Sequence, residues 1–301
     1  MKYNNISSDF GIFRFVRSSL NPFVLRFARA FLSLLPKGMR ASKNFDIKKT
    51  KVRTRDKKTI KTYLIKPRGE QGELPVLFYF HGGAFAFKAA PFHYKLAKTY
   101  AKECRVAVVF VDYRLSYCSK FETPLNDCVD AYQYYVTQAK KYHLNTKRIA
   151  VAGDSAGGYL SVMTTAEARK MNLPEPGCQM LVYPVIIPNS NTPSMQKFVD
   201  TPCWNAKLNK RMWEIYSKGN EVRNPLELGE MTLVRNNYIE TAEFDCLHDD
   251  AVEYAKFIKN NGGKVSLNET RQTVHGFDFY QKSPITKSAI GKRIAFLREN
   301  L

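Results

Sequence analysis

The 301-residue chain has few cysteines and no long apolar run. Its cysteines include no C-x-x-C pair, which argues against a zinc site and a disulfide framework and favours a reducing, cytoplasmic setting; they stand at 104, 118, 128, 178, 203 and 246. Because no stretch of about 18 apolar residues occurs, no membrane span is predicted. The segment FVLRFARAFLSLL is interrupted by Arg26 and Arg29 and lacks a clean cleavage site, so we predict no signal peptide.

Acidic residues are also scarce, since 27 Asp and Glu face 47 Lys and Arg, for a formal net charge of +20. Residues 37–68 alone hold thirteen basic residues against only Asp46 and Asp56, and three quarters of the net charge lies in the first 68 residues. No nucleic-acid recognition motif accompanies this basic part, so we expect no specific nucleic-acid partner and interpret it as a solvated face.

From residue 74 onward, strand-like and helix-like segments alternate. Strands are predicted at PVLFYF, RVAVVFVDY, RIAVAG, QMLVYPV, NNYIETAEF and KVSLNET, mostly with helices between them. This alternation predicts an α/β fold with a mostly parallel central sheet and helices on both faces.

Two parts of the chain lie outside the alternation. Residues 10–36 have the apolar spacing of two short helices, and FDIKKTKVRT with TIKTYLIKP predicts a basic β-hairpin. Residues 186–235 fit the alternation poorly and are interpreted as an insertion. The expected division is therefore a helical segment, 1–42, a core split into 43–185 and 236–301, and the insertion, 186–235.

The stretch RIAVAGDSAGGYLSVM places Ser155 between a buried strand and a helix. Gly153 and Gly157 have no Cβ, so the chain can turn sharply at the serine and expose its Oγ. Free N–H groups at the start of the following helix point toward the turn. This geometry suits a nucleophile.

The ends of three other predicted strands also carry reactive groups. His81-Gly82-Gly83 follow VLFYF, Asp245 follows NNYIETAEF, and His275 follows KVSLNET by a few residues. Reactive groups in α/β proteins gather at the carboxyl ends of strands. If the strands before Asp245 and His275 are neighbours, their ends lie roughly 5 Å apart and the two side chains can pair beside the serine.

The chemistry of acyl transfer requires such a set. A serine hydroxyl needs a histidine to accept its proton, and the histidine needs a carboxylate to fix its tautomer. The backbone N–H groups of Gly82, Gly83 and Ala156 are candidate donors to the oxyanion. The order Ser155, Asp245, His275 is the one expected for an α/β-hydrolase.

Several residues remain as rivals or supporting groups. His248 is an alternative base and Asp249 an alternative acid, while Asp154 is expected to be a structural hydrogen-bonding group. His81 is expected to shape the glycine loop through a backbone contact, and His93 and His143 to be surface residues. An aromatic set either lines an acyl pocket or packs the helices above the site: Trp204, Trp213 and Tyr216.

Five motifs together resemble the hormone-sensitive-lipase-like branch of the α/β-hydrolases, which includes carboxylesterases, acetyl esterases and arylacetamide deacetylases. They are HGGAF at 81–85, VDYRL at 111–115, GDSAGG at 153–158, the D-x-L-x-D-D run at 245–250 and HGF at 275–277. The resemblance runs from about residue 74 to the end and implies the roles given above for the triad and the oxyanion donors. It also implies a cap built from residues 1–42 and 186–235.

The chain departs from the family pattern at two loops. Ser116-Tyr117-Cys118 stand where relatives have A-P-E, and Asp245-Cys246-Leu247-His248-Asp249 where they have D-P-L-R-D. Neither change removes a member of the triad, but both leave the substrate preference open.

The sequence thus predicts a serine carboxylesterase that hydrolyses small to medium esters through an acyl-enzyme, without metal or cofactor. An amidase, an N-deacetylase or a lipid-ester hydrolase on the same triad stays open. A ligand-binding protein on a hydrolase scaffold is a rival, although the intact triad argues against it.

A last expectation concerns residues 12–35, which combine an aromatic-rich apolar stripe with four arginines, Arg14, Arg17, Arg26 and Arg29. Basic amphipathic helices of this kind bind anionic membranes. The family resemblance instead implies that the stripe closes over the active site as a cap. We expect the cap role, with peripheral membrane contact in addition to it.

Overall fold

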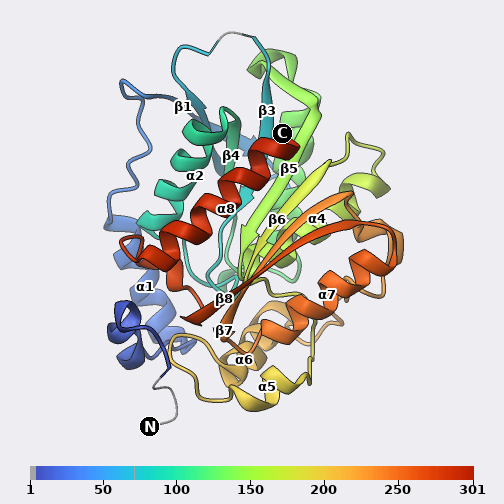
Figure 1. The fold of residues 1–301 in the computed structure, drawn as a ribbon. Coiled ribbons are helices and arrows are strands. Elements are labelled where there is room, and N and C mark those ends of the chain that lie inside the picture. Colours follow the sequence, from blue (N-terminus) through green and yellow to red (C-terminus); the bar gives the residue numbers. More distant parts are fainter. Residues whose placement is uncertain (1–4, 71) are drawn as a thin grey trace.

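The computed structural model describes residues 5–70 and 72–301 and is built around an eight-stranded sheet (Figure 1). The strand order is β1-β2-β4-β3-β5-β6-β7-β8; β1 and β2 form an antiparallel hairpin, β2 also runs antiparallel to β4, and β3 to β8 are parallel. The predicted α/β fold is confirmed. The strands are β1 (Phe45–Arg53), β2 (Thr59–Pro67), β3 (Leu74–Phe80), β4 (Ala107–Asp112), β5 (Leu144–Asp154), β6 (Cys178–Val182), β7 (Asn236–Phe244) and β8 (Lys264–Val274).

Helices cover both faces of the sheet, and both faces of the central strands are therefore apolar. In β3, the side chain of Phe78 lies on one face of the sheet and packs in the same cluster as α3 and α4. Its neighbours Leu77 and Tyr79 lie on the other face and pack in the same cluster as α2 and α8. The helices are α1 (Pro22–Leu34), α2 (Pro91–Cys104), α3 (Thr123–Thr137), α4 (Ala156–Lys170), α5 (Pro193–Lys197), α6 (Ala206–Ser217), α7 (His248–Asn260) and α8 (Pro284–Asn300). Short 3₁₀ segments are η1 (Ser8–Phe15), η2 (Ser116–Cys118), η3 (Lys140–Tyr142), η4 (Gly229–Thr232) and η5 (Phe277–Phe279). Among the described helices, none has both the length and the apolar character needed to cross a bilayer.

The N-terminal segment and the insertion gather at one end of the sheet, where β5 to β8 finish (Figure 1). Leu20 and Leu25 belong to the same apolar cluster as Trp204 and Trp213 of the insertion. A backbone hydrogen bond from Cys203 N–H to the carbonyl of Val16, 3.2 Å, ties the two parts together.

One expectation about this segment is wrong. The apolar stripe of α1 was expected to be buried over the active site, but only Leu25 of this helix is buried, and Phe23 and Phe27 are 79% and 74% exposed. The helix begins as expected, since the side chain of Asn21 accepts a hydrogen bond from Phe23 N–H and Pro22 stands in the first turn. The two aromatic residues simply lie on the side of the helix that faces away from the core.

Candidate active site

Ser155 stands at the sharp turn between β5 and α4. Its φ of +52° is costly for a residue with a side chain, by about 1–3 kcal/mol, and such strain is held only where the surroundings enforce it. The flanking glycines allow the turn, because a Cβ on Gly153 would collide with the carbonyl of Gly157, and a Cβ on Gly157 with the carbonyl of Phe80. The strand, turn and helix predicted around the serine are therefore present.

The structure brings Ser155, His275 and Asp245 into one hydrogen-bonded line. His275 Nε2 lies 2.9 Å from Ser155 Oγ, and His275 Nδ1 lies 2.6 Å from Asp245 Oδ2. All three side chains are buried, and the second oxygen of Asp245 accepts the backbone N–H of Leu247 at 3.1 Å. With Nδ1–H donated to the carboxylate, Nε2 is free to accept the serine proton.

The sheet register explains this arrangement. Strands β7 and β8 are parallel neighbours, as expected, and Phe244 pairs with Val274. Strand β8 extends four residues beyond the predicted KVSLNET run, so His275 follows its last residue directly. Asp245 and His275 thus leave adjacent strand ends together.

The rivals to these residues lie in contacts of their own. His248 Nδ1 is 2.8 Å from Asp249 Oδ1, and His248 Nε2 is 3.2 Å from Glu269 Oε1. Asp249 also accepts the backbone N–H of Ser194 at 2.7 Å, which ties α7 to α5. The geometry does not place either rival at Ser155.

The glycine loop, which we define as residues 81–85 after β3, shows that one expected oxyanion donor is wrong. The N–H of Gly82 donates to Asp154 Oδ2 at 3.0 Å, so it is not available to a substrate. Gly83, Ala84 and Phe85 follow with positive φ of +111°, +54° and +54°. Within residues 5–70 and 72–301, no group accepts the N–H of Gly83, Ala84 or Ala156. Ala84 was missed from the sequence, although it is the next residue after the glycine pair.

Asp154 is the structural hydrogen-bonding group expected at this turn. Besides Gly82 N–H, it accepts from Tyr79 Oη at 2.9 Å and from His93 Nε2 at 3.1 Å. Burial alone would raise its pKa, but His93 and Tyr79 outweigh burial and lower the pKa of Asp154 to about 2. The carboxylate is therefore ionised and fixes the glycine loop to the serine turn.

Two histidines support the same loop. His93 was expected at the surface and is instead buried; its Nδ1 accepts Ala90 N–H at 2.9 Å, so its proton sits on Nε2 and is donated to Asp154. His81, as expected, contacts the loop backbone, with Nδ1 2.7 Å from Gly82 O. Burial and the neighbouring His93 lower the pKa of His81 to about 4, so this ring is neutral at pH 7. His143 is exposed, as expected.

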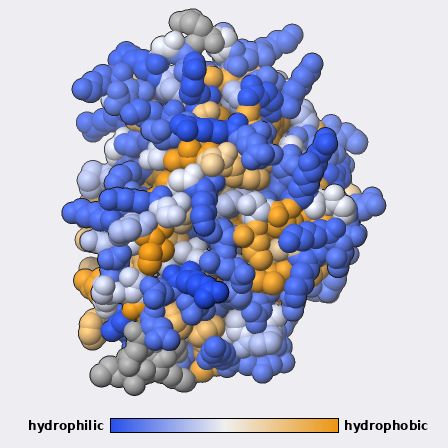
Figure 2. Space-filling view, viewed as in Figure 1, coloured by the Kyte–Doolittle hydropathy of each residue, from blue (hydrophilic) through white to orange (hydrophobic). Residues whose placement is uncertain are grey.

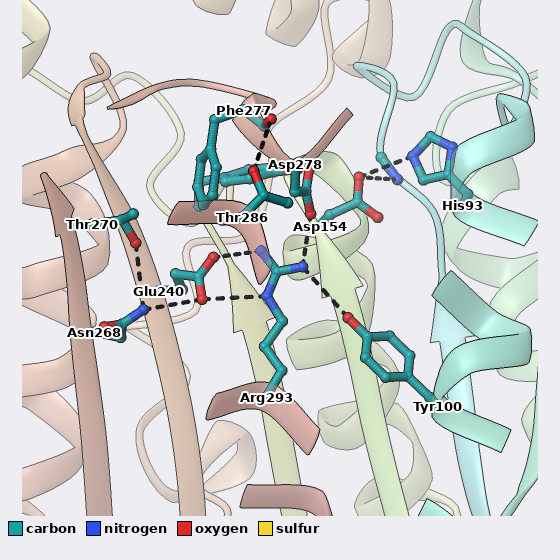
Figure 3. A network of polar contacts seen from close by, with 12 residues as sticks. His93, Tyr100, Asp154, Glu240, Asn268, Thr270, Phe277, Asp278, Thr286 and Arg293 are labelled. Carbon is teal, nitrogen blue, oxygen red and sulfur yellow. Dashed lines mark hydrogen bonds and ion pairs between the residues drawn. The ribbon is translucent and has the colours of Figure 1, made fainter. Parts of the chain in front are cut away.

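A buried ion network centred on Arg293 joins α8 to β7 and to Asp278, three residues after His275 (Figure 3). Arg293 of α8 pairs with Glu240 of β7 and, through Nη1, with Asp278 Oδ2 at 2.7 Å; all three are buried. Tyr183 Oη donates to the other oxygen of Asp278 at 2.5 Å, and the Tyr183 ring lies against the imidazole of His275 with 4.6 Å between centroids. This network could not be predicted from the sequence, because single charged residues in a strand and a helix ordinarily face solvent.

The aromatic set above the site is buried. Trp204 lies near the imidazole of His275, with centroids 5.8 Å apart, while Trp213 and Tyr216 pack with Phe85 of the glycine loop. Of the residues described, no group of three or more His, Cys, Asp or Glu is placed to hold a metal ion.

A strained serine turn, a Ser-His-Asp line and free N–H groups beside it, all at the carboxyl end of a mostly parallel sheet, define an α/β-hydrolase. The chain belongs to the family described as alpha/beta hydrolase fold, which matches residues 77–279. This confirms the resemblance to the hormone-sensitive-lipase-like branch.

Known relatives agree with this assignment. The chain is 30% identical to carboxylesterase NlhH of Mycobacterium tuberculosis, over 76% of this chain and 74% of the relative, and 29% identical to ethyl acetate hydrolase of Pseudomonas putida, over 74% and 73%. The solved structure of a bacterial heroin esterase superposes with a TM-score of 0.87 at 26% identity, over 100% of this chain and 99% of that one. At the level of its family, the chain is a carboxylic ester hydrolase.

Proposed function

We propose that this chain is a serine carboxylesterase that hydrolyses small to medium acyl esters through an acyl-enzyme intermediate. The observation that carries the proposal is the unbroken line from Ser155 Oγ through His275 to Asp245, with contacts of 2.9 and 2.6 Å. A relative named ethyl acetate hydrolase supports esters with a small acyl group.

In the acylation step, Ser155 Oγ attacks the ester carbonyl carbon while its proton passes to His275 Nε2. Asp245 stabilises the imidazolium that forms. The tetrahedral intermediate then collapses, the bond to the alkoxide breaks, and the alkoxide takes the proton from Nε2. The alcohol leaves, and the acyl group stays on Ser155.

In the deacylation step, a water molecule attacks the acyl carbon and gives its proton to the same Nε2. The second tetrahedral intermediate collapses to release the carboxylic acid, and the proton returns to Ser155 Oγ. The N–H groups of Gly83, Ala84 and Ala156 are the oxyanion donors in both steps, which is supported by their lack of an acceptor among the described residues.

The cap over this site is formed by residues 186–235 and by the described part of the segment 1–42, whose first four residues lie outside the described structure. The proposal is supported by the bond between Cys203 and Val16 and by the shared apolar cluster of Leu20, Leu25, Trp204 and Trp213. Trp204, next to the imidazole, is placed to contact an acyl or alcohol group of the substrate.

A cytoplasmic setting with peripheral contact to an anionic membrane completes the proposal. The six free cysteines, all within the described residues, suit a reducing compartment. The basic N-terminal part supports the membrane contact. The protein should therefore sediment with phosphatidylserine-containing vesicles at low salt, ignore neutral vesicles and dissociate near roughly 0.5 M salt, where screening shortens to about 4 Å. Equal recovery in the supernatant with both vesicle types at low salt would refute this contact.

The esterase proposal is tested by Ser155→Ala. Loss of the nucleophile from a cooperative triad lowers turnover about 10⁶-fold. The variant should remain folded, because the sharp turn at position 155 is made possible by the glycines around it. Turnover is measured on a series of p-nitrophenyl esters of rising acyl length, with the matching anilides to compare amide cleavage. Activity above a tenth of the wild-type value in the folded variant would remove Ser155 from the mechanism.

A further inference from the structure

One side of α1 carries four large apolar residues that nothing in the described chain covers. Phe23, Phe27, Phe31 and Leu34 are spaced by four, four and three positions and therefore lie along one face of the helix. All four are exposed, and Leu34 reaches 84%. Leu25, on the other side, anchors the helix to the core. We call this row the α1 apolar face.

The α1 apolar face has apolar neighbours. Ile12 and Phe15 of η1 and Phe279 of η5 are also exposed, and Phe13 joins η1 to η5 through a ring contact with Phe279 at 6.4 Å. In Figure 2, hydrophobic atoms interrupt the hydrophilic surface at the lower left, where Figure 1 places α1. Exposed apolar patches of this kind on a folded protein mark interaction sites.

The basic residues near the α1 apolar face indicate that its partner is negatively charged. Residues 10–45 contain no Asp or Glu and seven basic residues, which are Arg14, Arg17, Arg26, Arg29, Lys37, Arg40 and Lys43. Arg26 is exposed directly beside Phe27 in α1, and Arg17 and Arg29 are also exposed in this basic segment. An aromatic-rich apolar face flanked by arginines complements a surface with an apolar interior and an anionic rim, which is a bilayer that contains anionic lipid.

This region is also joined to the active site. Cys203, which is bonded to Val16 between η1 and α1, directly precedes Trp204, and the Trp204 ring lies against His275. Phe279 follows His275 by only four residues. A bilayer that contacts this region therefore lies beside the chain segments that hold the histidine.

We propose that the α1 apolar face docks the enzyme onto an anionic lipid bilayer, and that the substrates are esters dissolved in that bilayer. The docking part of this proposal depends only on the exposure of the apolar residues of α1 and on the positive charge near them. The substrate class rests on the proposed esterase function.

The test compares Phe27→Asp with Asn260→Asp, which adds the same charge at the exposed end of α7, on the opposite side of the molecule from α1 (Figure 1). Binding is measured by sedimentation with phosphatidylcholine vesicles that contain phosphatidylserine. Phe27→Asp should reduce the bound-to-free ratio at least ~10-fold, since a carboxylate cannot enter the apolar part of the interface. Asn260→Asp should bind as the wild type does.

Activity is measured in the same samples on water-soluble p-nitrophenyl acetate and on an octanoate ester of a lipophilic fluorogenic alcohol dissolved in the vesicles. Phe27→Asp should keep acetate turnover and lose octanoate turnover in proportion to binding. If the wild type binds vesicles but cleaves neither ester, the esterase function fails and docking stands. Equal binding of wild type and Phe27→Asp overturns the docking proposal, as does a wild-type dimer that ignores vesicles and that Phe27→Asp splits into monomers.

Discussion

The ring of Tyr183 lies against the imidazole of His275, 4.6 Å between centroids, and its hydroxyl donates to Asp278, which is only three residues after that histidine. Arg293 holds the other oxygen of Asp278. The C-terminal helix is thus connected to the imidazole through two buried side chains, Asp278 and Tyr183, which lie where they can hold the position of that ring.

Tyr183→Phe tests this connection, because it keeps the ring and removes the hydroxyl. Loss of a hydrogen bond to a charged group should lower the free energy of unfolding by about 2 kcal/mol, and the looser imidazole should lower kcat roughly 3–10-fold with little change in KM. Urea unfolding and p-nitrophenyl acetate turnover measure the two effects. Tyr254→Phe is the matched control, since its buried hydroxyl contacts Gln179 and Thr232 away from the triad. An equal fall of kcat in both variants would show that Tyr183 acts only through stability.

The second prediction separates two histidines. His275→Ala should reduce turnover by about 10⁴–10⁶ because the serine loses its base. His248→Ala should change it less than roughly tenfold, since this ring pairs with Asp249 and Glu269. The measurement is kcat/KM on one soluble ester for both folded variants. The reverse order of severity would place the base at His248.

The third prediction separates two carboxylates. Asp245→Asn should lower kcat about 10⁴-fold, because an amide favours the wrong tautomer of the imidazole. Asp249→Asn should leave kcat near normal, since this carboxylate contacts His248 and the backbone of Ser194. A normal rate in Asp245→Asn together with an inactive Asp249→Asn would move the acid to Asp249.

Much of the fold and the approximate site could be predicted, because both depend on local pattern. The alternation of apolar runs and helical segments predicted a mostly parallel sheet whose carboxyl strand ends carry the reactive residues, and the G-x-S-x-G run placed Ser155 at a turn that its flanking glycines allow. The pairing of the strands before Asp245 and His275 entered the sequence argument only as a condition, and the register of β7 and β8 meets that condition.

The errors have a common physical origin in long-range contacts. His93 has the spacing of a surface residue in a helix, and nothing nearby in sequence indicates that Asp154, 61 positions away, lies beneath it. Gly82 was expected to face the substrate, but the same carboxylate takes its N–H. Helix α1 is apolar on two sides, and hydrophobic spacing alone does not decide which side meets the core.

Asp250, in the first turn of α7, is a buried acid with an incomplete set of partners. The hydroxyls of Ser190 and Thr192 donate to its Oδ1 at 2.5 and 2.9 Å, while its Oδ2 has no partner among the residues described. Burial raises the pKa of Asp250 to about 7, with smaller contributions from the charges of Glu253 and Asp245. The folded protein therefore holds this proton up to a much higher pH than the unfolded chain does, in which an aspartate has a pKa of about 3.9.

The sign of the resulting pH dependence follows from linkage. Since the pKa is higher in the folded state, the stability contributed by protonated Asp250 is complete below about pH 4 and is lost as the pH rises through about 7. Asp250→Asn is neutral at every pH, so the decline in the free energy of unfolding between about pH 6 and pH 8 should be smaller than in the wild type, by about 1.4 kcal/mol. Urea unfolding across this range measures the decline.

Asp249→Asn is the control. Burial raises the pKa of Asp249, but His248 and Ser194 outweigh burial and lower it, so the charge of Asp249 does not change in this range. If wild type and Asp250→Asn show the same slope, Asp250 is already ionised in the folded protein, and the insertion that holds Ser190 and Thr192 is anchored by a charged group.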